Sequence, residues 1–358
     1  ELVKNPNFRM ERYPSESEPS ECEKSFVADA GKPLPLVDRG LMVIVREDPP
    51  MWFLFMQGKI DVSGIPKDNF SEAIDQGRKL TEKMRQRKIE LLKFRDPSTY
   101  WIGFNMEDEL VGDNPALRKA LSYGVNREKY VELFTNNRGE IAYGFIPPLM
   151  DAYSENIKDA GIGYDPNKAR RLVEQARQAA GGSLGELTLS VPGTGIVMRQ
   201  RGQFLQRGWK QIGLDVKVEY MDWPTFQNRV NNKGTQMFMM GWIADYPDAE
   251  NFLQLFYGPN KSPGSNNFNY DRSEFNELYE EVSVMRESPQ RRKLYREAER
   301  IVVKDCPAIF LFHGVAFVLK HHWVENYKPH AFQYGTSKYR DINRRQRQNY
   351  LKLLRELP

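Results

Sequence analysis

The chain has 358 residues and a formal net charge of +4, with 40% hydrophobic and 28% charged residues. This composition excludes an intrinsically disordered chain, and the length suits two domains with separate hydrophobic cores. Acidic and basic residues balance almost everywhere except in the basic C-terminal tail, so no nucleic-acid partner is expected.

Other features narrow the class of protein further. No apolar run approaches the roughly 18 residues that a membrane-spanning helix needs. The opening residues show neither a signal-peptide pattern nor a lipid-attachment cysteine, and ELVKNPNF reads as the end of a strand already in progress. Cys22 and Cys306 lack any metal-binding spacing, so they are expected to be two free thiols or one disulfide that closes a long loop.

The first hundred residues alternate between strand and helix patterns, which predicts a mixed or parallel sheet with covering helices. A polar stretch over 11–40 is expected to be a surface excursion. Runs of β-branched residues predict strands, and apolar residues at helical spacing predict helices. The expected strands cover 41–46, 60–65 and 89–94, and the expected helices cover 52–57 and 70–87.

A second α/β pattern begins near Ser98. Asn114 precedes a proline and so does Asp165, which is the pairing of an N-cap residue with proline in the first helical turn. The expected strands of this region cover 100–106, 187–191, 214–220, 236–242, 308–313 and 315–320. The expected helices cover 115–125, 127–134, 166–180, 198–212, 223–230, 272–286 and 289–304.

The basic tail over 341–358 is predicted to be an amphipathic helix that packs on the rest of the protein while its arginines stay in water. A helix that binds a membrane surface or nucleic acid is the alternative. The residues expected to pack are Ile342, Tyr350, Leu351 and Leu354.

The stretch GWIADYPDAENFLQLFY has the character of a binding site. An apolar strand runs into a loop where a proline prevents its continuation and Asp248 can cap the next helix. Asp245 lies at this junction of strand and loop, between Trp242 and Tyr246. A carboxylate beside aromatic walls can hold an ammonium group through charge-assisted hydrogen bonds. An Asp that caps its own turn is the simpler alternative.

Five motifs follow one another in an order and at gaps that resemble one protein family. They are NPALRKALSYGVNREKYV (114–131), IAYGFIPP (141–148), YDPNKARRLVEQA (164–176), GWKQIGLDVKVEYMDWPTF (208–226) and MGWIADYPDAENFL (240–253). Together they resemble the family-5 extracellular solute-binding proteins, the periplasmic oligopeptide- and dipeptide-binding proteins that feed ABC importers. The resemblance covers the chain from Asn5 to about Lys320.

The resemblance implies an α/β protein with two periplasmic-binding-protein-like lobes that are joined by a double-strand hinge and enclose the ligand. Residues 1–98 would form part of lobe I, 99–313 would form lobe II, and 314–358 would return to lobe I and end in the basic helix. Family members carry further residues ahead of the segment that matches ELVKNPNF. The N-terminal portion of lobe I is therefore expected to be missing from this chain, with a separate N-terminal segment of the same precursor as its companion.

The resemblance also assigns a role to Asp245, which stands where the family pairs a residue with the α-ammonium group of a peptide. Met239 stands where some peptide binders carry an arginine for the ligand's carboxylate, so that contact is left unassigned. The other residues expected to bind the ligand are Trp242, Tyr246, Trp101, Tyr100 and Asn105.

The expected function is a receptor that captures peptides and delivers them to a membrane-embedded ABC permease. It would act in the periplasm or from a lipid anchor on the outer face of the cytoplasmic membrane. The same fold with an oligosaccharide, an opine or a metal chelate as ligand is the first alternative, and an enzyme or stress-related scaffold is the second.

Catalytic residues and cofactors are not expected. The sequence has no GxSxG, HExxH or Gly-rich phosphate motif. A metal site is not expected either, because His321 and His322 would point to opposite faces of a strand.

Overall fold

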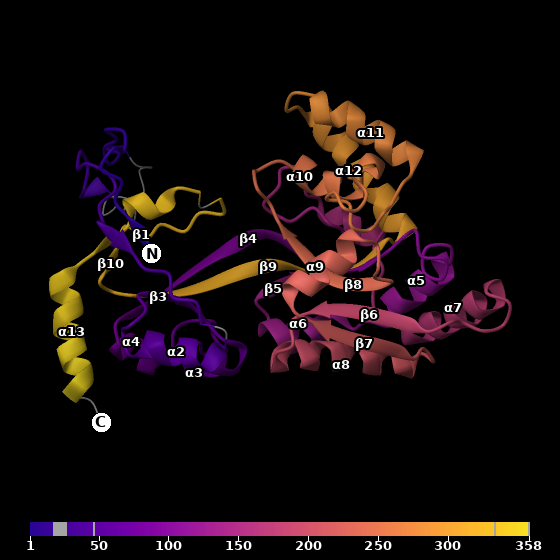
Figure 1. Ribbon diagram of the computed structural model, residues 1–358, viewed down its shortest axis with the longest axis horizontal. Coiled ribbons are helices and arrows are strands. Elements are labelled where there is room, and N and C mark those ends of the chain that lie inside the picture. Colours follow the sequence, from indigo (N-terminus) through magenta and orange to yellow (C-terminus); the bar gives the residue numbers. More distant parts are fainter. Residues whose placement is uncertain (17–26, 46, 333, 357–358) are drawn as a thin grey trace. The chain divides into compact units, whose positions relative to one another are not determined.

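The computed structural model of the chain describes residues 1–16, 27–45, 47–332 and 334–356. The chain forms two compact units, of which unit 1 comprises Glu1–Phe94 and Ala316–Pro358 and unit 2 comprises Arg95–Val315. The boundaries fall inside two long strands, β4 (Ile89–Phe104) and β9 (Ala308–His321) (Figure 1).

Each of these long strands replaces two shorter strands of the sequence prediction, which is wrong on this point. Pro97 and Gly314 fall in the gaps between the predicted strands, but each lies within a continuous strand. A side chain at Gly314 would meet the Ser98 hydroxyl oxygen at 2.4 Å, so the glycine allows a close approach of β4 rather than a turn.

Unit 1 consists of short elements around its portions of β4 and β9. Strand β1 (Leu2–Val3) pairs antiparallel with β2 (Arg39–Gly40), β3 (Val62–Gly64) with β9, and β10 (Val324–Glu325) with β11 (Asp341–Ile342). The helices are α2 (Asp48–Met56), α3 (Phe70–Ala73), α4 (Glu82–Gln86) and α13 (Arg344–Glu356), with 3-10 turns η2 (Lys67–Asn69) and η6 (Thr336–Tyr339).

The strand predicted at 41–46 is wrong. Residues 41–45 form no strand, and Leu41 and Ile44 are 75% and 93% exposed; Arg46 lies outside the described residues. A β-branched run becomes a strand only where a neighbouring strand pairs with it. Within the described part of the chain no strand pairs with this segment.

The single helix predicted over 70–87 is also wrong, because residues 74–80 turn back on themselves. Ile74 forms an isolated β-bridge with Leu80, and the Asp75 carboxylate accepts a hydrogen bond from the Lys79 amide at 2.9 Å. Arg78 takes the left-handed conformation (φ 57°) that such a turn requires. The apolar residues that suggested one helix therefore belong to α3, the turn and α4.

The tail is helical over Arg344–Glu356, as predicted, but Asp341 and Ile342, which were expected in the same helix, form strand β11. Tyr350 of α13 is buried and packs with Trp323, Val324 and Tyr327, and Ile342 packs against the same cluster. Arg344 and Arg345 are exposed. The side chain of Leu354 lies outside the described residues.

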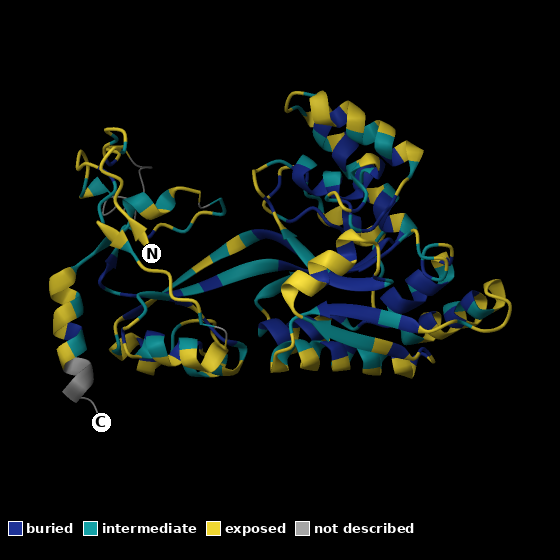
Figure 2. Cartoon of the chain, viewed as in Figure 1, coloured by how far each residue is buried: buried dark blue, intermediate teal, exposed yellow. Residues whose placement is uncertain are grey.

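A sheet forms the centre of unit 2. The order of the whole sheet is β3–β9–β4–β8–β6–β7, and β5 (Gly139–Ile141) also pairs with β9. Strand β6 (Leu187–Pro192) is parallel to both β7 (Val216–Met221) and β8 (Met237–Ile243), whereas β4 is antiparallel to β8. Most residues of β6 and the first six residues of β9 are buried (Figure 2).

The helices of unit 2 follow the sequence prediction closely. They are α5 (Pro115–Tyr123), α6 (Arg127–Thr135), α7 (Pro166–Ala179), α8 (Ile196–Gln211), α9 (Trp223–Asn231), α10 (Glu250–Leu253), α11 (Ser273–Val284) and α12 (Pro289–Asp305). The 3-10 turns are η3 (Glu155–Asp159), η4 (Gln254–Phe256) and η5 (Gly258–Asn260). The predicted N-caps are confirmed: Asn114 accepts a hydrogen bond from the Leu117 amide at 3.0 Å, and Asp165 accepts one from the Lys168 amide at 2.9 Å.

A buried carboxyl group links α12 to the segment around residue 146 within unit 2. Glu299 of α12 is 1% exposed and accepts a hydrogen bond from the Ile146 amide at 2.9 Å. Burial raises the pKa of Glu299 from 4.5 to about 7, although hydrogen bonds from the Ile146 and Phe145 amides oppose the rise. Glu299 therefore retains its proton in the folded chain at pH values where the unfolded chain has lost it.

This proton makes the stability of unit 2 depend on pH. The stabilisation is fully present below pH 4.5 and is lost as pH rises through 7, because deprotonation then costs the folded state alone. Glu299→Gln keeps an acceptor for the Ile146 amide without an ionisable group. We expect its free energy of unfolding, relative to the natural chain, to rise by about 3 kcal/mol between pH 4.5 and pH 8 in urea titrations. A parallel drift in Glu297→Gln, whose side chain is exposed on the same helix, would contradict the assignment.

Candidate functional site

Three parallel strands of unit 2 end at the same edge of the sheet. Because β6, β7 and β8 run in one direction, their carboxyl ends lie side by side (Figure 1). The chain continues from these ends into the start of α8, the start of α9, and residues 244–251, here called the Asp245 loop. Ligands of open α/β sheets bind beyond the carboxyl ends of the strands. This edge is therefore the candidate binding site.

The Asp245 loop is held by one buried amide side chain. Asn251 is fully buried, and its Oδ1 accepts hydrogen bonds from the Trp242 indole at 2.8 Å and from the Asp245 amide at 3.0 Å. Its Nδ2 donates to the Asp245 carboxylate at 3.4 Å. The side chain of Asp245 is exposed, so Asn251 orients the carboxylate without removing it from solvent.

A second anchor ties the loop to α12. Asp248 accepts hydrogen bonds from the Glu250 amide at 2.9 Å and from the Tyr295 hydroxyl at 2.8 Å, and it forms an ion pair with Arg291 at 2.6 Å. Burial raises the pKa of Asp248, but the Glu250 amide and Arg291 outweigh it and hold the pKa below its usual value. The helix cap predicted at Asp248 is wrong, because Ala249 is the N-cap residue of α10. Asp248 lies one residue earlier and is a charged link to α12.

Tyr246 takes part in a hydroxyl–carboxylate cluster at the rim of the loop. Its hydroxyl donates to Glu250, which also accepts from the Tyr279 hydroxyl. Burial and the negative charge of Glu250 raise the pKa of Tyr246 to about 12, so the phenol keeps its proton. Tyr246 is still 42% exposed and leaves part of its ring open beside Asp245.

A cavity of about 150 Å³ lies at the same carboxyl edge. Its walls come from the ends of β6 and β8, from β4 and β9, and from α6, α8 and α9. Tyr100 forms one wall, with its ring stacked on Phe312 at 4.7 Å between centroids. A side chain at Gly241 would meet the Tyr100 ring at 2.4 Å, so the absence of a side chain there lets this ring lie flat against β8. Other residues of the lining are Met198, Arg201, Trp223, Met239 and Met240.

Trp101 borders the same cavity, but its ring belongs to the core. Adjacent residues of a strand point to opposite faces. The Trp101 ring packs against Phe268 at 5.5 Å between centroids and is 2% exposed. Of the two aromatic neighbours on β4, Tyr100 is the one whose ring covers Gly241 and stacks on Phe312.

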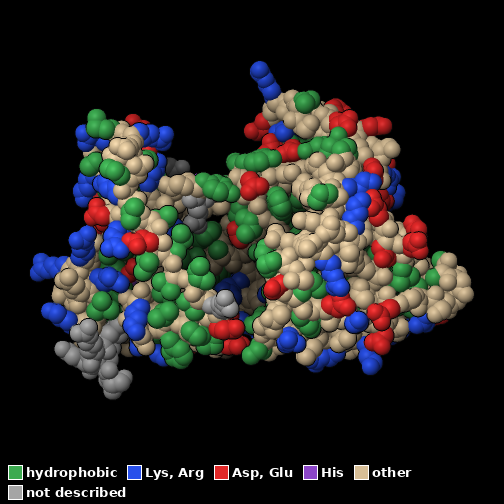
Figure 3. Space-filling model, viewed as in Figure 1, with side chains coloured by type: hydrophobic (Ala, Val, Ile, Leu, Met, Phe, Trp, Pro, Cys, Tyr) green, Lys and Arg blue, Asp and Glu red, His purple; other side chains and the backbone are tan. Residues whose placement is uncertain are grey.

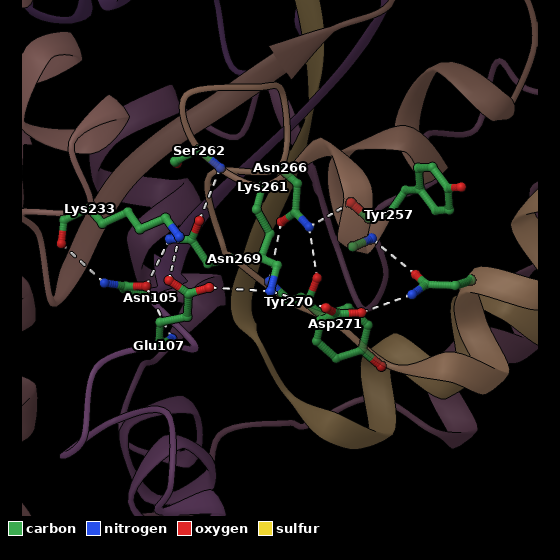
Figure 4. A network of polar contacts seen from close by, with 12 residues as sticks. Asn105, Glu107, Lys233, Tyr257, Lys261, Ser262, Asn266, Asn269, Tyr270 and Asp271 are labelled. Carbon is green, nitrogen blue, oxygen red and sulfur yellow. Dashed lines mark hydrogen bonds and ion pairs between the residues drawn. The ribbon is translucent and has the colours of Figure 1, made fainter.

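Asn105 lies in a separate polar network (Figure 4). It is 5% exposed, its Nδ2 donates to the Lys233 carbonyl at 3.2 Å, and its Oδ1 accepts from the Asn269 side chain at 2.8 Å. Lys261 links this network to Glu107 at 3.2 Å and to Asp271 at 3.0 Å. These contacts join the segment that follows β4 to residues 261–271.

Two residues of the site were missed by the sequence analysis. Asn251 holds the Asp245 loop, and Arg201 is the charged residue of the cavity lining. The spacing of Met198 and Arg201, three residues apart on a predicted helix, indicates a shared face. Only the packing of α8 shows that this face meets Tyr100 and Tyr130.

Other expectations of the sequence analysis concern charge, metals and thiols. Acidic and basic side chains are mixed over the visible face of unit 2 (Figure 3). Among the described residues, no group of three or more His, Cys, Asp or Glu side chains could hold a metal ion, and none of the helices is long and apolar enough for a membrane span. Cys306 is a buried free thiol, and Cys22 lies outside the described residues.

The anchor at Asp248 leads to a stability prediction. Asp248→Asn leaves Arg291, whose side chain is 10% exposed, without its ionic partner. Loss of a charged hydrogen-bond partner at such a position typically costs about 2 kcal/mol. We expect the midpoint of urea unfolding to fall accordingly, whereas Asp245→Asn, at an exposed position three residues away, should change the free energy of unfolding by less than about 0.5 kcal/mol. Equal effects of the two substitutions would show that Asp248 does not anchor the loop.

This chain aligns with only part of the length of its relatives of known function. Heme-binding protein A of Haemophilus influenzae is 27% identical over 252 residues, which are 69% of this chain and 45% of that protein. The dipeptide-binding protein of Escherichia coli is 26% identical over 242 residues, which are 66% of this chain and 44% of that protein. The chain thus spans less than half the length of these relatives.

Solved structures show which fold the chain has. The periplasmic binding protein DppA from Helicobacter pylori, in complex with the peptide STSA, matches with a TM-score of 0.71 at 22% identity, over 84% of this chain and 56% of that one. The oligopeptide-binding protein AppA from Bacillus subtilis, in complex with a nonapeptide, also matches with a TM-score of 0.71, at 20% identity, over 84% of this chain and 60% of that one. The chain shares the α/β fold of these two-lobed periplasmic binding proteins.

Residues 1–264 match the family described as bacterial extracellular solute-binding proteins, family 5 Middle. The match covers most of the chain and includes β4, the cavity lining on β8 and the whole Asp245 loop. The chain belongs to the family-5 bacterial extracellular solute-binding proteins.

Proposed function

We propose that this chain is part of a receptor that captures peptides outside the cytoplasm and delivers them to an ABC importer. The observation that carries the proposal is the exposed carboxylate of Asp245, fixed by Asn251 at the carboxyl edge of three parallel strands. Family membership and the peptide-bound relatives support the choice of ligand. On this proposal the protein binds its ligand without chemical change, and it works in the periplasm or at the outer face of the cytoplasmic membrane.

The two units would be the two lobes of the receptor. In this assignment residues 99–313 form the lobe that closes on the ligand, and residues 1–98 and 314–358 belong to lobe I. The strands β4 and β9 would act as the double-strand hinge, because both cross from one unit to the other. The relatives are more than twice as long as the matched segment, so a separate N-terminal segment would complete lobe I, and an ABC permease would receive the ligand.

Asp245 would hold the α-ammonium group of the peptide. The carboxylate has Trp242 and Tyr246 on either side in sequence, and Tyr246 is 42% exposed. An aromatic face next to a carboxylate stabilises an ammonium group both by charge-assisted hydrogen bonds and by cation–π attraction. The Asn251 side-chain amide donates a hydrogen bond to this carboxylate at 3.4 Å and orients it.

Haem is the second candidate ligand, because a relative with 27% identity is named for haem binding. The cavity of about 150 Å³ can take only a part of so large a ligand, although the thioether groups of Met198, Met239 and Met240 in its lining can contact an apolar ring edge as well as a peptide side chain. Haem binding would give an intense absorption band near 400 nm on titration, and peptide binding would give none.

Asp245→Asn tests the peptide proposal, since it keeps the shape of the side chain and removes its charge. We expect the substitution to weaken binding of the tripeptide Ala-Ala-Phe by about thirty-fold or more, equivalent to about 2 kcal/mol, in calorimetric titrations. Binding of N-acetyl-Ala-Ala-Phe, which lacks the ammonium group, should change little.

Glu186→Gln is the matched control, because Glu186 is an exposed carboxylate just before β6, at the opposite end of the strand from the site. It should affect neither peptide. An equal loss of affinity for the free and the acetylated peptide in Asp245→Asn would contradict the ammonium contact.

A further inference from the structure

The cavity of unit 2 contains one charged side chain in otherwise apolar and aromatic surroundings. Arg201 of α8 is half-buried, and it is the only charged residue among the described residues that line the cavity. The residues around it are the aromatic rings of Tyr100, Tyr130 and Trp223 and the side chain of Met198. No carboxylate of the lining neutralises the guanidinium group.

The position of Arg201 follows from the packing of α8. Gly202 lies against β7, where an added side chain would meet the Tyr220 hydroxyl oxygen at 2.2 Å, and Leu205 and Trp209 are buried in the core. This packing places the Arg201 guanidinium 6.0 Å from the centre of the Tyr130 ring and 5.9 Å from that of Phe134. Cation–π attraction holds the group over these rings but provides no hydrogen-bond acceptor.

The Arg201 side chain has a buried hydrogen-bond donor that is not paired within the described part of the chain. Its Nε atom is buried and has no hydrogen-bond partner within the described part of the chain. Buried donors are nearly always paired in native proteins, and an unpaired one costs free energy. The positive charge is also felt by its neighbours, since it opposes the rise that burial causes in the pKa of Tyr100 and of Tyr130. The site therefore has a charged donor, an apolar wall and no internal anion.

We infer that Arg201 binds a carboxylate of the ligand inside this cavity. A planar guanidinium group pairs with a carboxylate in bidentate geometry, and the aromatic and thioether walls suit the apolar side chain next to it. Arg201 would bind the carboxylate that Met239, three residues before Trp242, cannot bind. The inference rests on the proposed function and narrows it to ligands with a free carboxylate beside an apolar group.

Titration with free and amidated peptides tests the inference. The natural chain should bind Ala-Ala-Phe at least about tenfold more tightly than Ala-Ala-Phe amide. Arg201→Met keeps a long apolar side chain and should abolish this preference by weakening the acid alone. Arg207→Met is the matched control, because Arg207 is exposed on the same helix, and it should retain the preference. A preference that survives in Arg201→Met would overturn the inference.

A second measurement separates this inference from the proposed function. The Nε–Hε resonance of Arg201, assigned by its absence from the spectrum of Arg201→Met, should shift with N-acetylphenylalanine and stay in place with N-acetylphenylalaninamide. This shift is expected even if free peptides fail to bind, which would contradict only the proposed function. A resonance that moves with inorganic phosphate but not with N-acetylphenylalanine would refute the carboxylate assignment, as would one that moves with neither.

Discussion

The parallel direction of β6, β7 and β8 is the constraint on which the site depends. Parallel strands place their carboxyl ends at one edge of the sheet, so three segments that are distant in sequence meet there. These segments carry Arg201, Trp223 and Asp245. The antiparallel pairing of β4 then sets Tyr100 opposite Gly241 and closes the cavity from the other side.

Buried and exposed polar groups have different roles in the site. The Asp245 loop is fixed by hydrogen bonds and an ion pair within the protein, made by Asn251, Asp248 and Arg291. Asp245, in contrast, is exposed, and Arg201 lines the cavity. A binding protein needs both kinds. A ligand binds more tightly when its charged partners are already held in the bound orientation, because less conformational entropy is then lost on binding. This arrangement favours recognition of a ligand's end groups.

Sequence patterns predicted the helices and the parallel strands of unit 2 well, because caps such as Asn114 and Asp165 and apolar periodicity are local signals. They failed where structure depends on distant partners. Residues 41–45 have the composition of a strand but no pairing strand within the described chain. Pro97 lies inside β4, where its carbonyl accepts a hydrogen bond from the distant Ala244 amide at 2.8 Å. Within the candidate site, the aromatic neighbours of Asp245 in the sequence indicated it as a candidate. Arg201 had no such signal, because its surroundings arise from the packing of α8.

The central claim is that unit 2 carries the surface that contacts the ligand, and hydrogen exchange tests it most directly. The chain would be labelled with deuterium in the presence and absence of saturating Ala-Ala-Phe, whose ammonium group, aromatic ring and carboxylate match the three features of the site. The account predicts slower exchange in the peptides that cover residues 196–203 and 237–251. Slower exchange confined to residues 1–94 and 316–358, or the absence of any change at saturation, would contradict it.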